Sequence, residues 1–280
     1  MAVEATTART VLGEPVVTVT STSGTDIAYQ VTGSGDPTTC FVPGLAQAIA
    51  ETRPFGSGVL GSRVFVDLRG QGSSAAPPGD DAAAWTYRAL AADVAAVVEQ
   101  TGATRALGVS LGAGALLDLV IREPDLFDRL VLALPTAIDQ PRPAEAIRLA
   151  DQMADAVDAN DQVALGQLLL ELQPIPARRR ADVVMWARRH AYEIGGTAVS
   201  RMMRTLPRHI PVPDPNRLRS IAVPVLVLGQ RDDPSHPIEI AEQLAAMLPD
   251  AALVISDDSW LWSGRSNLRE VVGAFLNEQK

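Results

Sequence analysis

The sequence is poor in cysteine, in histidine and in long apolar runs. Cys40 is its one cysteine, so the chain has no disulfide within itself. The three histidines form no cluster with it that suggests metal ligands. No stretch approaches the ~20 continuous apolar residues of a membrane span, and residues 1–15 lack the apolar segment of a signal peptide. We therefore expect a cytoplasmic protein that has no membrane contact and needs no metal or other cofactor.

Charge narrows the choice of partners. The chain has 33 acidic and 24 basic residues, which gives a formal net charge of −9. Nucleic acids and anionic membrane surfaces repel such a protein, so neither is expected as a partner. At 280 residues, of which 47% are hydrophobic, the chain is long enough for a full core. The expected partner is a hydrophobic small molecule, and the composition leaves the oligomeric state open.

Short apolar segments alternate with helical patterns along most of the chain. Strands are predicted at residues 16–20, 27–31, 39–42, 64–67, 105–109, 130–134, 225–228 and 252–255, and helices at 87–100, 111–122, 238–248 and 267–277. This alternation predicts an α/β fold, with a mostly parallel twisted sheet and helices on both faces.

The alternation stops in the middle of the chain. Residues 137–213 contain four predicted helices and no convincing strand. We therefore expect three parts: a flexible tail at 1–15, a core over 16–136 and 214–280, and a helical cap inserted at 137–213.

A Gly-x-Ser-x-Gly motif at residues 108–112 stands between a predicted strand and a predicted helix. A serine on such a tight turn has strained backbone angles, and Gly108 and Gly112 leave the space that the turn requires. The helix N-terminus favours an anion that develops beside Ser110. The context predicts a nucleophile, and the alternative is a glycine-rich turn with an idle serine.

Several further segments, in the right order, resemble the α/β-hydrolase superfamily over nearly the whole chain. Pro43-Gly44 stands where the family usually has His-Gly, residues 67–74 resemble its Asp-x-Arg-Gly-x-Gly-x-Ser segment, residues 129–132 resemble the strand after the serine turn, and residues 229–232 resemble the segment with its acid. The resemblance implies an α/β-hydrolase fold with a cap. It also implies an oxyanion hole made by the backbone amides of Leu45 and Leu111, with Gly44 beside the substrate.

The same resemblance assigns the acid of a catalytic triad to Asp232. Asp233 is a competitor one residue further on, and a plain turn aspartate is the alternative. The family's histidine should follow the last strand, but residues 256–266 contain none, and Ser259 stands nearest to its position. Because a serine hydroxyl is a poor nucleophile without a neighbouring base, the triad is atypical.

Three histidines are candidates for the absent base. His236 is the best placed, because it lies on the loop of the acid; its alternative is a loop or helix-start histidine. His190 on a cap helix and His209 in the proline-rich return to the core are weaker candidates.

Two tryptophans replace small or polar groups that are expected near the family's base. Trp260 and Trp262 either fill the substrate pocket and exclude water or pack the last loop against the core. Trp186 and Tyr192 are expected to pack the cap. The arginines at 178–180 are expected at a solvated helix start, or as contacts for an anionic substrate.

We therefore expect an esterase-like enzyme for a small hydrophobic ester, thioester, lactone or related carbonyl compound. Two alternatives stay open. Relatives in secondary metabolism host cyclisation, elimination or rearrangement on this scaffold, which suits a chain without the family histidine. The chain could also be a non-catalytic protein that binds a small molecule, because fold does not fix function.

Overall fold

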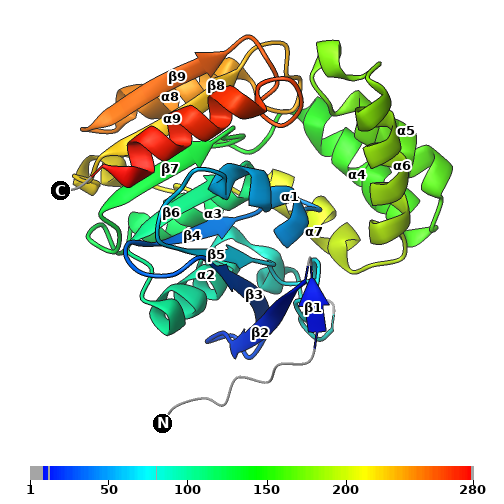
Figure 1. Cartoon of the computed structure of the whole chain (residues 1–280). Coiled ribbons are helices and arrows are strands. Elements are labelled where there is room, and N and C mark those ends of the chain that lie inside the picture. Colours follow the sequence, from blue (N-terminus) through cyan, green and yellow to red (C-terminus); the bar gives the residue numbers. More distant parts are fainter. Residues whose placement is uncertain (1–8, 12, 80, 279–280) are drawn as a thin grey trace.

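A nine-stranded sheet forms the centre of the computed structural model, which describes residues 9–11, 13–79 and 81–278 (Figure 1). The strand order is β1-β2-β3-β5-β4-β6-β7-β8-β9. The strands are β1 (Arg9–Val11), β2 (Glu14–Thr20), β3 (Asp26–Thr32), β4 (Thr38–Val42), β5 (Ser62–Val66), β6 (Arg105–Val109), β7 (Arg129–Ala133), β8 (Val225–Gln230) and β9 (Ala251–Ser256). Pairing is antiparallel from β1 to β5 and parallel from β5 to β9. The predicted mostly parallel sheet is confirmed.

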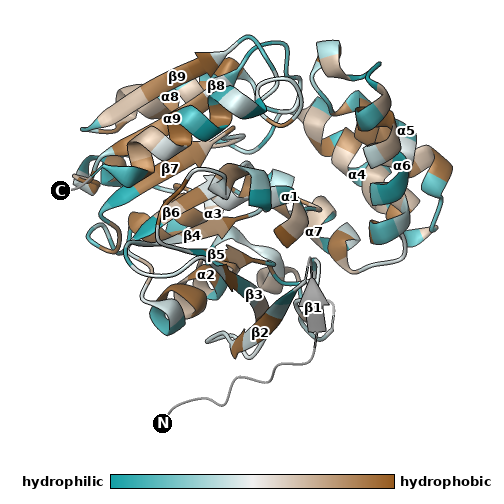
Figure 2. Ribbon diagram, viewed as in Figure 1, coloured by the Kyte–Doolittle hydropathy of each residue, from teal (hydrophilic) through white to brown (hydrophobic). Residues whose placement is uncertain are grey.

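Helices cover both faces of this sheet. The core helices are α1 (Ile49–Thr52), α2 (Tyr87–Thr101), α3 (Leu111–Val120), α8 (Ile238–Met247) and α9 (Arg265–Asn277). Successive side chains of a strand point to opposite faces: Cys40 and Val42 of β4 join the cluster with α2, α3 and α8, whereas Phe41 joins the cluster with α9. Burial on both faces explains why the central strands are hydrophobic along their length (Figure 2).

Four helices lie between β7 and β8 in the sequence. They are α4 (Ala144–Asp158), α5 (Gln162–Glu171), α6 (Ala181–Ile194) and α7 (Val199–Thr205). The first three form a group beside the sheet (Figure 1) and share a hydrophobic cluster that includes Met153, Leu165 and Ala191. The limits of the cap at 137 and 213 stay predictions. No helix among the described residues is long and apolar enough to cross a bilayer.

The N-terminal segment corrects one prediction. Residues 1–15 were expected as a flexible tail, but residues 9–11 pair with residues 14–16 as an antiparallel hairpin. Residues 1–8 and residue 12 lie outside the described residues. Strand β1 has only three residues and is followed by a turn at Gly13, so the sequence contains no longer apolar run that would predict it.

The segment at residues 67–74 has a structural role next to the serine turn. The carboxylate of Asp67 accepts hydrogen bonds from the amide of Ile49 at 2.7 Å and from the amide of Ser73 at 2.8 Å. Arg69 and Asp93 form a fully buried ion pair at 2.6 Å. Because Ile49 begins α1, this segment fixes the chain that follows Gly44 and Leu45.

Cys40 gives a test of the central packing. Its side chain is fully buried, and burial raises the pKa of the thiol to about 12. Because the thiolate is the reactive form, we expect iodoacetamide at pH 8.5 to leave the native protein unmodified and to alkylate it once in denaturant. Intact-protein mass spectrometry measures both. Rapid alkylation of the native protein would contradict the packing of β4.

Candidate functional site

Ser110 stands on a tight turn between β6 and α3. Its backbone has φ 52° and ψ −108°, a strained conformation for a residue with a side chain. A Cβ added to Gly108 would lie 2.5 Å from the carbonyl of Gly112. One added to Gly112 would lie 2.4 Å from the carbonyl oxygen of Val42. The turn therefore needs both glycines, as the motif predicts.

The requirement at Gly112 can be measured. We expect Gly112→Ala to lower the free energy of unfolding by about 1–3 kcal/mol, because the methyl group meets backbone that cannot move aside. Gly166→Ala is the matched control. Its Cβ would meet nothing closer than 3.9 Å, and alanine is the better helix former, so stability should stay or rise by up to about 1 kcal/mol. Urea denaturation measures both, and equal stabilities would contradict the described turn.

His236 reaches the serine from another loop. Its Nε2 lies 3.0 Å from Ser110 Oγ, and its Nδ1 lies 2.9 Å from Asp233 Oδ2. In the tautomer that satisfies both contacts, Nδ1–H donates to the carboxylate and the lone pair of Nε2 accepts the Ser110 hydroxyl. The structure therefore brings together a hydroxyl, an imidazole and a carboxylate.

The carboxylate in this arrangement is Asp233, which corrects the assignment of Asp232. Asp232 has φ 54°, is exposed, and contributes its backbone carbonyl to the amide of Ile175 at 3.0 Å. Its carboxylate has no hydrogen bond within the described part of the chain. Adjacent side chains leave the backbone in different directions, so Asp233 is buried toward His236 while Asp232 faces solvent.

The loop from Asp233 to His236 is held from several sides. Asp233 also accepts hydrogen bonds from Gln230 Nε2 at 3.2 Å and from the amide of Ser235 at 2.9 Å. Ser235 Oγ donates to the carbonyl of Leu172 at 2.7 Å. Arg142 donates to the carbonyl of Ser235 at 2.9 Å. These contacts fix the imidazole relative to Ser110. The sequence gives no role to Arg142, because its partner Ser235 is 93 residues away, or to Gln230, because the direction of its side chain depends on the fold.

Arg142 is a basic residue that interacts with the carboxylate of the site. Burial lowers the pKa of its guanidinium, and the charges of Tyr87 and Asp233 act in the opposite direction. Even a lowered arginine pKa leaves the group charged at neutral pH. Arg142 therefore places a positive charge near Asp233.

The loop after β9 has a different role from the one expected. Trp260 is fully buried in the core and donates from Nε1 to the carbonyl of Gly229 at 2.8 Å, so its prediction as a substrate-binding residue is wrong. Its amide donates to Gln230 Oε1, the side chain that also contacts Asp233. The tryptophan packs the loop and positions the partner of the carboxylate.

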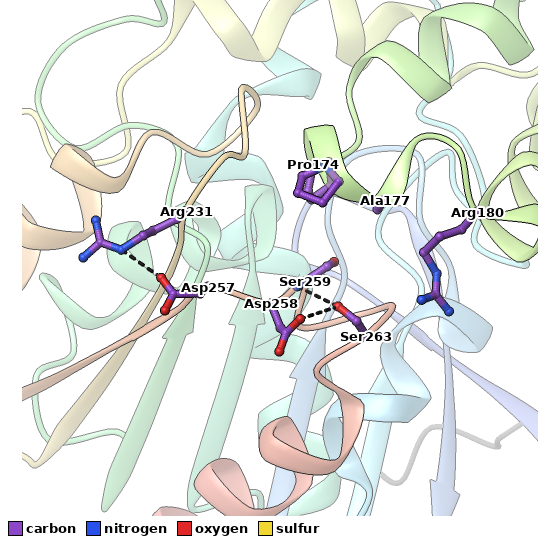
Figure 3. A pocket seen from close by; sticks show the side chains of 9 residues that line it. Pro174, Ala177, Arg180, Arg231, Asp257, Asp258, Ser259 and Ser263 are labelled. Atoms are coloured by element: carbon purple, nitrogen blue, oxygen red, sulfur yellow. Dashed lines mark hydrogen bonds and ion pairs between the residues drawn. The ribbon is translucent and has the colours of Figure 1, made fainter.

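Ser259, nearest to the position of the family histidine, lies beside a second, smaller cavity of about 240 Å³. Figure 3 shows this cavity, with the ion pair of Arg231 and Asp257 on one side. Ser263 donates to Asp258 at 3.0 Å and accepts from the amide of Ser259 at 3.2 Å. These bonds close the loop on itself.

Ser110 and His236 open into a cavity of about 800 Å³ between the sheet and the helices α4, α5 and α6. Gly44 and Leu45 line it beside the serine. The amides of Leu45 and Leu111 donate no hydrogen bond to any other described residue. Leu111 follows Ser110 directly, and Leu45 follows Gly44, at which an added Cβ would lie 3.5 Å from the Cβ of Ser110.

Aromatic side chains form one part of the cavity wall. Trp262 lines it, donates from Nε1 to Gln173 at 3.0 Å and meets the ring of Trp186 edge-on at 5.5 Å. His190 also lines the cavity but makes no hydrogen bond with Ser110, and exposed His209 lies outside it. Of the three histidines, only His236 reaches the serine.

Comparison with known proteins relates this geometry to a family. A family model described as alpha/beta hydrolase fold matches residues 30–259. A curated protein of Mycobacterium tuberculosis with the name "Putative non-heme bromoperoxidase BpoC" is 28% identical in an alignment of 254 positions that covers 80% of this chain and 86% of that protein.

Two solved structures share the fold. A thermophilic esterase from Thermogutta terrifontis has a TM-score of 0.74 at 22% identity, over 92% of this chain and 96% of the esterase. An enol-lactonase from Burkholderia xenovorans LB400 has a TM-score of 0.79 at 19% identity, over 93% of this chain and 100% of the enol-lactonase. From its strand order, its serine turn and a family match that covers most of its length, the chain belongs to the alpha/beta hydrolase fold family.

Proposed function

We propose that the protein is a serine hydrolase for small hydrophobic esters, thioesters or lactones, with Ser110, His236 and Asp233 as its triad. The observation that carries the proposal is the pair of contacts at His236, 3.0 Å to the serine hydroxyl and 2.9 Å to the carboxylate. A base within hydrogen-bond reach of the hydroxyl, and oriented by a third group, is the arrangement that activates a serine.

The reaction follows from these positions. Ser110 Oγ attacks the substrate carbonyl while its proton passes to His236 Nε2, and Asp233 stabilises the imidazolium that forms. The amides of Leu45 and Leu111 hold the negative oxygen of the tetrahedral intermediate. The proton then passes to the leaving alcohol or thiol as the acyl–enzyme forms. Water, deprotonated by His236, releases the acid and restores Ser110.

The cavity supports a hydrophobic substrate of small to medium size. Its volume of about 800 Å³ is typical of a small-molecule site. Its walls are mainly apolar and include Leu149, Met153, Leu172 and Trp262. The names of the two solved relatives, an esterase and an enol-lactonase, agree with this class of substrate.

The geometry favours hydrolysis over the two alternatives. A protein that only binds a ligand has no need for a serine in contact with an oriented base. Cyclisation or elimination needs a placed proton acceptor but does not need two unpaired amides beside a strained serine. The coincidence of all three features is the reason to prefer acyl transfer.

A panel of p-nitrophenyl esters from acetate to octanoate tests the proposal. We expect hydrolysis by the wild type, with the best kcat/KM for a middle chain length, and loss of at least about 10⁴-fold with Ser110→Ala. Because Ser110 is half-buried and alanine is smaller, this variant should keep its fold, which circular dichroism checks. Equal rates for both proteins would overturn the proposal.

A further inference from the structure

A cluster of metal-ligating side chains lies across the junction of cap and core. Glu51 belongs to α1, whereas His190 and Glu193 belong to α6. One ligand atom from each of the three lies within 4.8 Å of the other two. Glu51 and His190 also line the large cavity, so the cluster stands at the edge of the site described above.

The histidine of this cluster is buried and lacks a hydrogen bond. The His190 side chain is 4% exposed, and its Nδ1 has no hydrogen-bond partner among the described residues. This nitrogen lies 3.5 Å from Glu193 Oε2. The imidazole stacks on the ring of Trp186 at 4.9 Å, which fixes its plane. A buried polar atom without a partner is costly, and a cation between His190 and the carboxylates would satisfy it.

The two carboxylates are held near the histidine by their own contacts. Glu51 Oε2 accepts a hydrogen bond from the amide of Ala48 at 3.1 Å. Glu193 is about half exposed and lies 3.3 Å from Arg189 in an i,i+4 pair. A neutral imidazole and two carboxylates balance the charge of a divalent cation, and nitrogen and oxygen ligands together suit Zn²⁺.

We propose that Glu51, His190 and Glu193 form a Zn²⁺ site that links cap helix α6 to core helix α1. Three protein ligands leave a fourth position for water. Glu51 contacts Ala48 in the segment that follows Leu45. The cation therefore fastens the cap beside the predicted oxyanion segment, and it does so whether or not Ser110 is a nucleophile.

Isothermal titration of the metal-free protein with Zn²⁺ tests the site. We expect one equivalent to bind, with at least about tenfold weaker binding in Glu193→Gln and none in His190→Gln. Glu193→Gln is the decisive variant, because the residue is half exposed and its amide keeps the shape of the side chain. Binding of the cation to the folded state should also raise the melting temperature of the wild type.

Two histidine variants serve as controls. His209→Gln removes an exposed imidazole outside the cluster, and His236→Gln removes the one beside Ser110. Both should bind Zn²⁺ as the wild type does, and the total tryptophan emission, to which Trp186 contributes, should change on binding in every protein except His190→Gln. Absence of binding to the wild type, unchanged affinity in Glu193→Gln, or loss of binding in His236→Gln would each overturn the site. Ester hydrolysis is not a readout here, so a failure of this site leaves the proposed hydrolase activity untouched.

Discussion

Replacing His236 by glutamine is expected to lower kcat for a p-nitrophenyl ester by about 10⁶-fold, which leaves only the residual catalysis from binding and the oxyanion amides. Glutamine can still contact Ser110, but it cannot take the proton that leaves the hydroxyl at 3.0 Å. KM should change little, because the imidazole acts on the transition state and only touches one edge of the cavity. Initial rates over a range of ester concentrations give both constants.

His209→Gln is the control for this experiment, since it removes an exposed imidazole and should keep the wild-type kcat. A second variant, His236→Ala, leaves room for free imidazole, and added imidazole should restore part of the lost rate. If His236→Gln kept more than about a tenth of the wild-type kcat, the base would have to be another group.

Asp233→Asn is expected to lower kcat by about 10⁴-fold while the fold is kept. The amide would donate to His236 Nδ1, which forces the proton onto Nε2, so that a hydrogen faces Ser110 where a lone pair is needed. The 2.9 Å contact between Asp233 and His236 would persist with its direction reversed. Steady-state kinetics and urea denaturation together separate this loss from unfolding.

Asp232→Asn is the matched control, one residue away and of the same chemistry. Its carboxylate is exposed, so kcat should stay within about twofold of the wild type. The reverse outcome, a large loss at Asp232 and a small one at Asp233, would restore the acid that the family resemblance assigns.

Features of the molecule that depend on local sequence could be predicted. The strand at residues 105–109 and the helix start at Leu111 agree with the structure because an apolar run, a Gly-x-Ser-x-Gly turn and a helical pattern follow one another. The turn leaves no space for a side chain at Gly108 and Gly112, and this requirement can be inferred from the geometry of the backbone alone. The alternation of apolar strands and helices is also a local pattern, and it is enough to predict a mostly parallel sheet.

The partners of Ser110 could not be predicted in the same way. His236 is 126 residues away in the chain, and its spacing from the acid says nothing about the direction of its ring. The choice between Asp232 and Asp233 depends on a positive φ at Asp232, which no pattern in Asp-Asp-Pro specifies. Trp260 is ambiguous because a tryptophan suits a pocket wall and a core equally well.

The cluster of Glu51, His190 and Glu193 also could not be predicted from the sequence. Glu51 lies on core helix α1, whereas His190 and Glu193 lie on cap helix α6, so the three residues form no cluster in the sequence. Only the packing of α6 beside α1 brings them together. The packing of the cap against the core is tertiary structure, and no local sequence pattern predicts it.

The most direct test of the account compares the rate at which a fluorophosphonate probe modifies Ser110 in the wild type, His209→Gln and His236→Gln. This reaction needs only the serine, its base and the oxyanion amides, so it does not depend on the identity of the substrate. We predict one probe per chain on Ser110 in the first two proteins, at equal rates, and at least about 10³-fold slower modification in His236→Gln. Equal rates in all three proteins would contradict the claim that His236 activates Ser110.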